Sequence, residues 1–181
     1  IALINIIFRP TIKGQKLSEV IIYYLEMNNI SELNPKLESK GVSVIEAEIK
    51  DFRVNRFLYQ YVGELWDWTD KLSHTDEQWK AYAESTSLHT YIAYYKGAIA
   101  GYFELQSTVS GDVEIKYFGL AEKFIGKGFG GYLLTCAIKA AWSLPDTKRL
   151  WLHTCSLDHP SAIQNYQARG FTVYKEEIET N

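Results

Sequence analysis

Residues 124–134 read Phe-Ile-Gly-Lys-Gly-Phe-Gly-Gly-Tyr-Leu-Leu, and four of the chain's 12 glycines fall within this stretch. The run before it, 113–120, has the composition of a β-strand, and apolar residues recur at helical spacing in 132–142. A strand, a glycine loop and a helix in this order present unpaired backbone N–H groups to an anion. We therefore predict a phosphate-binding loop, with Lys127 adding charge at its rim; the alternative is a glycine-rich turn before an ordinary helix.

The spacing of these glycines also fits a dinucleotide fingerprint. Gly126, Gly128 and Gly131 match G-x-G-x-x-G, a weak signal when it stands alone. The match comes late in the chain, and the acidic residue expected about twenty positions later falls near Asp146, in a Pro-Asp turn rather than at a strand end. No Gly-Lys-Ser/Thr is present, so a P-loop is excluded. A nucleotide-binding oxidoreductase is the weaker alternative.

Two motifs resemble those of the GNAT superfamily of acyl-CoA-dependent N-acetyltransferases. Residues 125–130, Ile-Gly-Lys-Gly-Phe-Gly, resemble its pyrophosphate loop, Arg/Gln-x-x-Gly-x-Gly/Ala, with Ile125 where the family usually has Arg or Gln. Residues 158–171 resemble its C-terminal signature: Asp158 replaces the usual Asn, and four further positions match, namely Ala162, Tyr166, Gly170 and Phe171. The resemblance covers about 42–176 and implies that acetyl-CoA is the cosubstrate.

The resemblance also implies a set of residues that handle the acyl donor. Tyr166 stands where the family holds the tyrosine that protonates the departing CoA sulfur, although it also fits as a packing residue. The backbone N–H of Phe118 would bind the oxyanion, and Leu120 would pair with the pantetheine arm. The implied CoA-binding residues are Phe118, Leu120, Ile125, Gly126, Lys127, Gly128, Gly130, Gly131 and Asp158.

A general base is needed because a free amine is mostly protonated near neutral pH. Glu114 is the first candidate, since 114–120 is similar to the strand on which some histone-type members carry a catalytic glutamate. His153 is the second candidate, because imidazole titrates near neutrality. A hairpin centred on Val109 would place Glu104 opposite Glu114, whereas one centred on 110–111 would place Glu104 opposite Tyr117.

The acceptor pocket is expected between the inserted helices. Trp66 and Trp68, with Phe57 and Tyr61, are candidates to hold an amine by cation–π contact, and Glu104 is a further candidate. Core packing explains these aromatic residues equally well. The sequence leaves small amines, amino acids and peptide N-termini open as acceptors.

Composition narrows the class of protein. A net charge of −3 with no basic block argues against a nucleic-acid partner. Two cysteines, Cys136 and Cys155, fit a reduced, cytoplasmic protein, and four scattered histidines give no zinc pattern. The apolar run 1–8 is too short to span a bilayer and lacks a positive n-region, so we predict no membrane partner.

The order of elements predicts one domain over residues 1–181, with an N-terminal strand or extension (1–17) and a core at 42–176. Strands are expected at 19–27, 42–49, 90–95, 98–106, 113–120, 149–155 and 171–176, and helices at 51–62, about 73–84, 132–142 and 158–169. This is an α+β fold: a mixed, mostly antiparallel sheet flanked by helices, in which the resemblance implies that splayed strands form the acetyl-CoA cleft.

The expected reaction is acetyl transfer from acetyl-CoA to a primary amine of a small molecule or peptide, by direct attack in a ternary complex without a metal. A non-catalytic acyl-CoA-binding domain is the main alternative, because a protein can keep this fold after its catalytic activity has been lost. The sequence leaves a homodimer open.

Overall fold

The computed structural model describes residues 19–66 and 68–180. The predicted strand or extension at 1–17 lies outside these residues. Within the described residues, seven strands form one sheet in the order β2-β3-β4-β5-β6-β1-β7. In chain order they are β1 (Glu19–Met27), β2 (Val42–Glu46), β3 (Leu88–Tyr95), β4 (Ala98–Ser107), β5 (Asp112–Leu120), β6 (Arg149–Cys155) and β7 (Thr172–Thr180). All neighbouring strands are antiparallel except β5 and β6, so the sheet is mixed and mostly antiparallel, as predicted.

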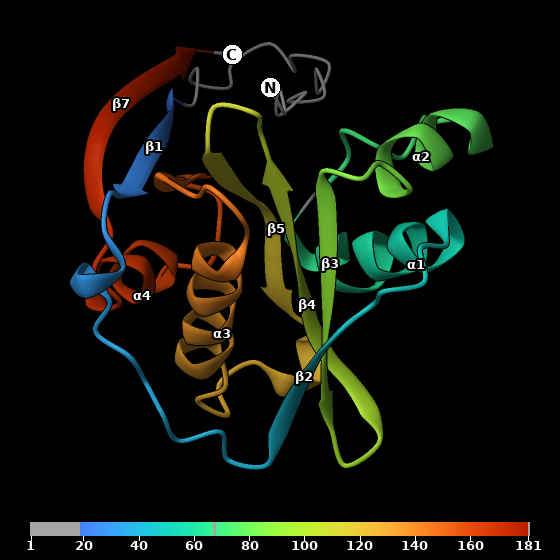
Figure 1. The fold of residues 1–181 in the computed structure, drawn as a ribbon, viewed down its shortest axis with the longest axis horizontal. Helices are drawn as coiled ribbons and strands as arrows, with labels where there is room; N and C mark the ends of the chain where they lie inside the picture. The colour runs from blue at the N-terminus through green and yellow to red at the C-terminus, as the bar shows by residue number, and fades with distance from the viewer. Residues whose placement is uncertain (1–18, 67, 181) are drawn as a thin grey trace, which may run out of the picture.

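Helices cover both faces of the sheet (Figure 1). The helices α3 (Gly130–Ser143) and α4 (Ala162–Ala168) lie on one face, while α1 (Phe52–Gly63) and α2 (Asp76–Ala83) lie on the other. Short 3₁₀ turns lie at Ile30–Glu32, Glu64–Trp66 and Glu122–Phe124. Residues 100–105 of β4 are buried without the alternation of a half-exposed strand, because apolar layers cover it on both sides.

Local chemistry explains where the helices begin. The Asp51 side chain accepts a hydrogen bond from the Arg53 N–H and caps α1. Thr75 forms a capping box with Gln78 at the start of α2. Both helices present apolar residues to the sheet, including Leu58, Val62 and Trp79, which are almost fully buried.

The prediction for the last helix was wrong at its start. A helix was expected from Asp158, with Pro160 in its first turn, but α4 begins at Ala162. The Asp158 carboxylate instead accepts hydrogen bonds from the Thr154 hydroxyl and the Cys155 N–H, which holds a turn after β6. The helix ends at Ala168, one residue before the predicted end, and Gly170 follows the C-cap Arg169 with a φ of 106°.

The placement of β1 could not be anticipated from the order of elements. It pairs with β6 on one side and with β7 on the other, and so lies between two strands from the end of the chain. The predicted second strand, 42–49, ends earlier, at Glu46. The hairpin of β4 and β5 turns at 108–111, and it places Glu104 opposite Tyr117 and Gln106 opposite Glu114.

Candidate active site

The glycine loop joins β5 to α3 and adopts a conformation that requires glycine. Gly126 and Gly128 have φ values of 78° and 77°, a region that residues with a Cβ rarely enter. Both residues and Lys127 between them are exposed. Helix α3 begins immediately afterwards at Gly130, and no side chain caps its first turn. The loop therefore leaves backbone N–H groups at the positive end of a helix available to an anion.

Cationic side chains from other parts of the chain surround this loop. A Cβ on Gly131 would lie 2.9 Å from Cδ of Lys36 and 3.1 Å from Nη1 of Arg169, and a Cβ on Gly128 would lie 2.8 Å from Nζ of Lys40. Because Gly128 and Gly131 have no Cβ, space remains beside the three cationic side chains, and a phosphate could occupy it. The sequence analysis missed all three residues, because Lys36 and Lys40 precede β2 and Arg169 follows α4. The position of Arg169 beside Gly170 in the second motif was the only available signal.

Arg169 provides the best test of whether a phosphate group fits here. Its Nε is buried and has no hydrogen-bond partner among the described residues. An unpartnered buried N–H of a guanidinium is costly, and a phosphate oxygen is a natural acceptor for it. The residues around the glycine loop therefore fit the pyrophosphate of a CoA molecule.

Strands β5 and β6 separate next to this loop. Their parallel pairing consists of three positions and ends at Glu114 and Trp151. From Ile115 to Leu120, the edge of β5 that faces β6 has no partner strand in the described part of the sheet. Phe118 and Leu120 lie on this segment, as the predicted roles require, and both are half-buried. This opening is where an extended ligand can form backbone hydrogen bonds.

Tyr166 lies across this opening from β5. Its ring packs edge-on against Phe118, with ring centroids 6.1 Å apart, and against Phe171, also at 6.1 Å. Burial and the negative charge of Asp158 raise the pKa of the Tyr166 phenol well above its ordinary value, so it keeps its proton at neutral pH. The structure therefore brings Tyr166 and Asp158 of the second motif together with Phe118 of β5. Asp158 influences this phenol by its charge, and its carboxylate is engaged in the turn after β6.

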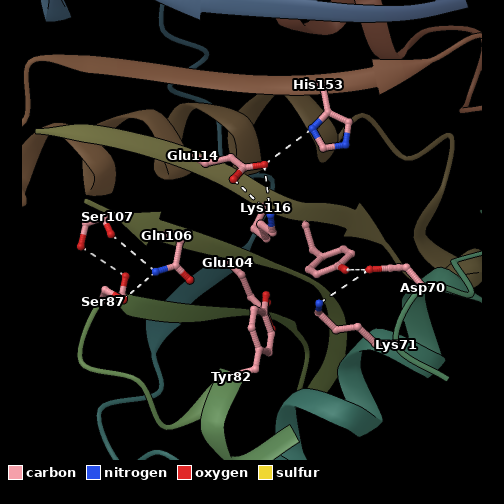
Figure 2. A network of polar contacts seen from close by, with 11 residues as sticks. Asp70, Lys71, Tyr82, Ser87, Glu104, Gln106, Ser107, Glu114, Lys116 and His153 are labelled. Carbon is pink, nitrogen blue, oxygen red and sulfur yellow. Dashed lines mark hydrogen bonds and ion pairs between the residues drawn. The ribbon is translucent and has the colours of Figure 1, made fainter. Parts of the chain in front are cut away.

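On the α1/α2 side of the sheet, Glu114 lies between the side chains of Lys116 and His153 (Figure 2). Its Oε2 lies 3.2 Å from Nζ of Lys116, and its Oε1 lies 3.6 Å from Nδ1 of His153 on β6. Burial alone would raise the pKa of Glu114, but the hydrogen bond with His153 and the charge of Lys116 outweigh it and lower the pKa. The two predicted base candidates thus form one pair, at the point where β5 and β6 separate.

Glu104 is the most deeply buried carboxyl group of this region, at 1% exposure. Asn55 Nδ2 donates to its Oε1 at 2.8 Å, and the Tyr82 hydroxyl donates to its Oε2. Burial raises the pKa of Glu104 despite these hydrogen bonds and the nearby charges of Lys71 and Lys116. The hydrogen bonds of Glu104 therefore connect α1 and α2 to strand β4.

The two predicted acceptor-pocket tryptophans lie in different surroundings. Trp68 packs on the rings of Tyr59, Tyr102 and Tyr117 at centroid distances of 5.0–6.2 Å. A Cβ on Gly119 would lie 2.6 Å from Cγ1 of Val62, so glycine at this position allows α1 to pack closely on β5. Trp66 is half-buried and lies edge-on to His159, with ring centroids 5.5 Å apart. The exposed rings of Phe57 and Tyr61 stack on each other.

The loop before α2 contributes two charged residues that the sequence analysis missed. The Asp70 carboxylate accepts hydrogen bonds from the hydroxyl groups of Tyr59 and Tyr117. The Lys71 ammonium lies 4.2 Å from the centroid of the Tyr82 ring and 5.6 Å from that of Tyr117. In the sequence, Asp70 and Lys71 look like an ordinary pair of charged residues in an exposed loop. Their burial could therefore not be predicted from the sequence.

No group of three or more His, Cys, Asp or Glu side chains in residues 19–66 and 68–180 has a metal-binding arrangement. Within the same residues, no helix is long and apolar enough to cross a membrane.

Comparison with known proteins agrees with this geometry. The family model described as Acetyltransferase (GNAT) family matches residues 45–171, more than half of the chain. No curated protein matches the sequence.

Solved structures with the same fold are distant in sequence. A GCN5-related N-acetyltransferase from Sphaerobacter thermophilus is 15% identical with a TM-score of 0.67, and the match covers 89% of this chain but 51% of that one. A GCN5-related N-acetyltransferase from Kribbella flavida is 12% identical with a TM-score of 0.64, at 87% and 56% coverage.

A third structure is more similar in length. It is an aminoglycoside acetyltransferase from an uncultured soil metagenomic sample, 10% identical with a TM-score of 0.60, and the match covers 72% of this chain and 88% of that one. At these identities the likeness concerns the fold. The chain spans little more than half the length of the first two structures.

Proposed function

The chain belongs to the acetyltransferase (GNAT) family, and we propose that it transfers an acetyl group from acetyl-CoA to a primary amine of a small molecule or peptide. One observation carries the proposal: the opening between β5 and β6 lies beside a glycine loop at a helix N-terminus, where Arg169 holds an unpartnered buried N–H. An acyl-CoA placed there would have its phosphates at the loop and its pantetheine arm along the free edge of β5.

We assign the donor side of the reaction to three parts of this opening. The loop residues from Ile125 to Gly131, with Lys127 at their rim, bind the phosphates. The free edge of β5 at Phe118 and Leu120 holds the arm and supplies an N–H to the developing oxyanion. Tyr166, kept protonated by burial and by Asp158, donates its proton to the departing thiolate.

We assign the acceptor side to the face that carries Glu114. The amine must lose a proton before or during its attack on the thioester carbon, and Glu114 can accept it through a water molecule. Because its pKa is lowered, Glu114 is a carboxylate over the whole neutral range. His153 stabilises that carboxylate and is the second candidate for the base. The nitrogen–carbon bond forms as the carbon–sulfur bond breaks, so no covalent enzyme intermediate is needed.

The test is consumption of acetyl-CoA, followed as release of free thiol, against a panel of primary amines that includes amino acids, peptides, polyamines and aminoglycosides. We expect turnover with at least one class and a stoichiometric acetylated product by mass spectrometry. Calorimetry with acetyl-CoA runs in parallel. Tight binding without turnover would indicate a non-catalytic acyl-CoA-binding domain, and no binding would reject the donor site.

A further inference from the structure

Two buried lysines lie on the acceptor side, and their environment distinguishes them from ordinary surface lysines. The side chain of Lys71 is 11% exposed and that of Lys116 is 9% exposed. They come from different elements, the loop before α2 and strand β5, and both extend into the region beside Glu104 and Glu114 (Figure 2). Lysine is rarely this buried unless its charge is paired.

The Lys71 ammonium is short of hydrogen-bond acceptors. Among the described residues its ion-pair partner is Oδ2 of Asp70, at 3.7 Å, which is beyond an ordinary hydrogen bond, and the charge of Glu104 also acts on it. Asp70 is engaged instead by the hydroxyl groups of Tyr59 and Tyr117. The other described neighbours of the ammonium are the faces of the Tyr82 and Tyr117 rings, which attract a cation without accepting a hydrogen bond along a lone pair. Burial lowers the pKa of Lys71, as expected for such a cation.

Lys116 is the neighbour that couples this cation to the candidate base. Its Nζ lies 3.2 Å from Oε2 and 3.4 Å from Oε1 of Glu114, and its positive charge contributes to the lowered pKa of Lys71. Lys116 faces this side because the pairing of β4 with β5 shifts by one residue between Glu104 and Leu105, which leaves it as the extra residue of a bulge. The two ammonium groups therefore lie close to each other and to the proposed site of proton transfer.

We propose that Lys71 and Lys116 bind a carboxylate of the acceptor, so that the acceptor is a free amino acid or a close analogue with an anion beside its amine. This inference rests on the proposed acetyl transfer. A protonated amine without an anion would bring a further positive charge and no acceptor for Lys71, because the carboxylates of Asp70 and Glu114 already have partners. A carboxylate two bonds from the amine offsets that charge and gives Lys71 the acceptor it lacks, while the amine faces Glu114.

A singly charged carboxylate suits this region better than a phosphate. Asp70, Glu104 and Glu114 already place three carboxyl groups around the two lysines. A doubly charged phosphate would be repelled more strongly by them than a carboxylate would. The buried ammonium and carboxylate groups match a small zwitterion, because its carboxylate can pair with the lysines and its amine with Glu114.

The decisive experiment compares matched acceptors with the wild-type protein and needs no variant. Each L-amino acid of a panel is assayed beside its own amide, which keeps the side chain and amine and replaces the carboxylate with a neutral group. The amide also mimics the N-terminal residue of a peptide. A charge-assisted hydrogen bond of ordinary strength corresponds to about a 10- to 100-fold preference in kcat/KM, and we expect the amino acid to be favoured by that factor, mainly through KM.

Two variants then locate the effect. Lys71→Gln and Lys116→Gln should reduce the preference for the acid over the amide, whereas the matched control Lys80→Gln, at an exposed position of α2, should retain it. Melting temperatures show whether each variant is folded. If Lys71→Gln fails to fold, Lys116→Gln and the wild-type comparison still decide the question.

Several results would overturn the inference. Equal or faster acetylation of the amides would reject it while leaving the proposed acetyl transfer intact, and so would a preference that persists in both folded variants. One added acetyl mass on Lys71 after incubation with acetyl-CoA alone would make Lys71 an acceptor rather than an anchor. If no amine or amino acid of the panel is acetylated, the proposed function fails, and the inference fails with it.

Discussion

The donor side and the acceptor side of the site, at the point where β5 separates from β6, are built from different kinds of chemical groups. On the donor side, backbone N–H groups of an exposed glycine loop face solvent, and long cationic side chains surround them. On the acceptor side, buried carboxyl and ammonium groups from α1, the loop before α2, β4, β5 and β6 hold one another by hydrogen bonds and ion pairs. The first arrangement binds a constant chemical group, the phosphate, through the backbone. The second is made of side chains and can therefore differ from one member of a fold to the next.

The largest effect is expected from Tyr166→Phe, which lies where the two sides meet. Loss of the proton donor should lower the rate of acetyl transfer by about 10²–10⁴-fold, because the thiolate would leave without a proton in a poorly solvated cleft. The affinity for acetyl-CoA should stay within a fewfold, since the ring remains. Single-turnover kinetics measure the chemical step directly.

The control for this variant is Tyr174→Phe, at a tyrosine of β7 that is 42% exposed. A wild-type chemical rate in Tyr166→Phe would leave this tyrosine with a packing role between Phe118 and Phe171. Melting temperatures separate a chemical defect from a displaced α4.

Gly130→Glu should damage the donor side alone. A Cβ at this position makes ordinary contacts, at 3.7 Å from Asn165 Nδ2 and 3.9 Å from Leu120 Cδ1, so the protein should fold. The added carboxylate faces the phosphates and should weaken acetyl-CoA binding by about 100-fold, or ~2.7 kcal/mol. Calorimetry measures the affinity, and Gly130→Ala is the matched control. Undiminished affinity in folded Gly130→Glu would place the phosphates elsewhere.

Glu114→Gln should damage the acceptor side alone. We expect kcat/KM to fall by about 10–100-fold near neutral pH, and by less as the pH approaches about 10, where the amine has already lost its proton. Acetyl-CoA affinity should not change. The measurement is a pH–rate profile beside Glu77→Gln, an exposed residue of α2. A profile that changes only with substitution of His153 would assign the base to that residue.

The smallest effect concerns Glu104 and is a change in stability. Burial raises its pKa in the folded protein, so the wild type loses stability as the pH rises from the ordinary pKa of a glutamate to this higher value. Glutamine does not titrate and can keep the contacts with Asn55 and Tyr82. The melting temperature of Glu104→Gln relative to wild type should therefore increase as the pH rises above the ordinary pKa of a glutamate, by about 2–4 °C for each ~1 kcal/mol. A difference independent of pH would show that Glu104 does not titrate in this range.

The donor side was largely predictable from the sequence because its signals are local. The glycines, the strand before them and the helix after them are contiguous, and the predicted strand 149–155 agrees with β6 at both ends. The helix after the glycines was predicted two residues too short at its start and one at its end. Arg169 and Lys36 escaped notice because their approach to Gly131 depends on tertiary packing.

The acceptor side was predictable only in part because its contacts join distant segments. Glu114 and His153 were both identified, but their pairing follows from the register of β5 with β6. Two hairpin registers were open for Glu104, and the turn at 108–111 decided between them. Lys71 gave no signal, since the burial of a loop lysine depends on rings from α2 and β5.

The position of β1 has a consequence for how the molecule is made. A ribosome releases this strand before any other described strand, yet its partners β6 and β7 are translated after all the other described strands. In the meantime β3, β4 and β5 can pair as hairpins and β2 can pair with β3, while β1 keeps two unpaired edges. Closure of the sheet is therefore a long-range event, and such events are slow because the entropy of a large loop must be overcome first. Within the described residues β7 pairs with β1 alone, so the last described strand depends for its place in the sheet on the first described strand.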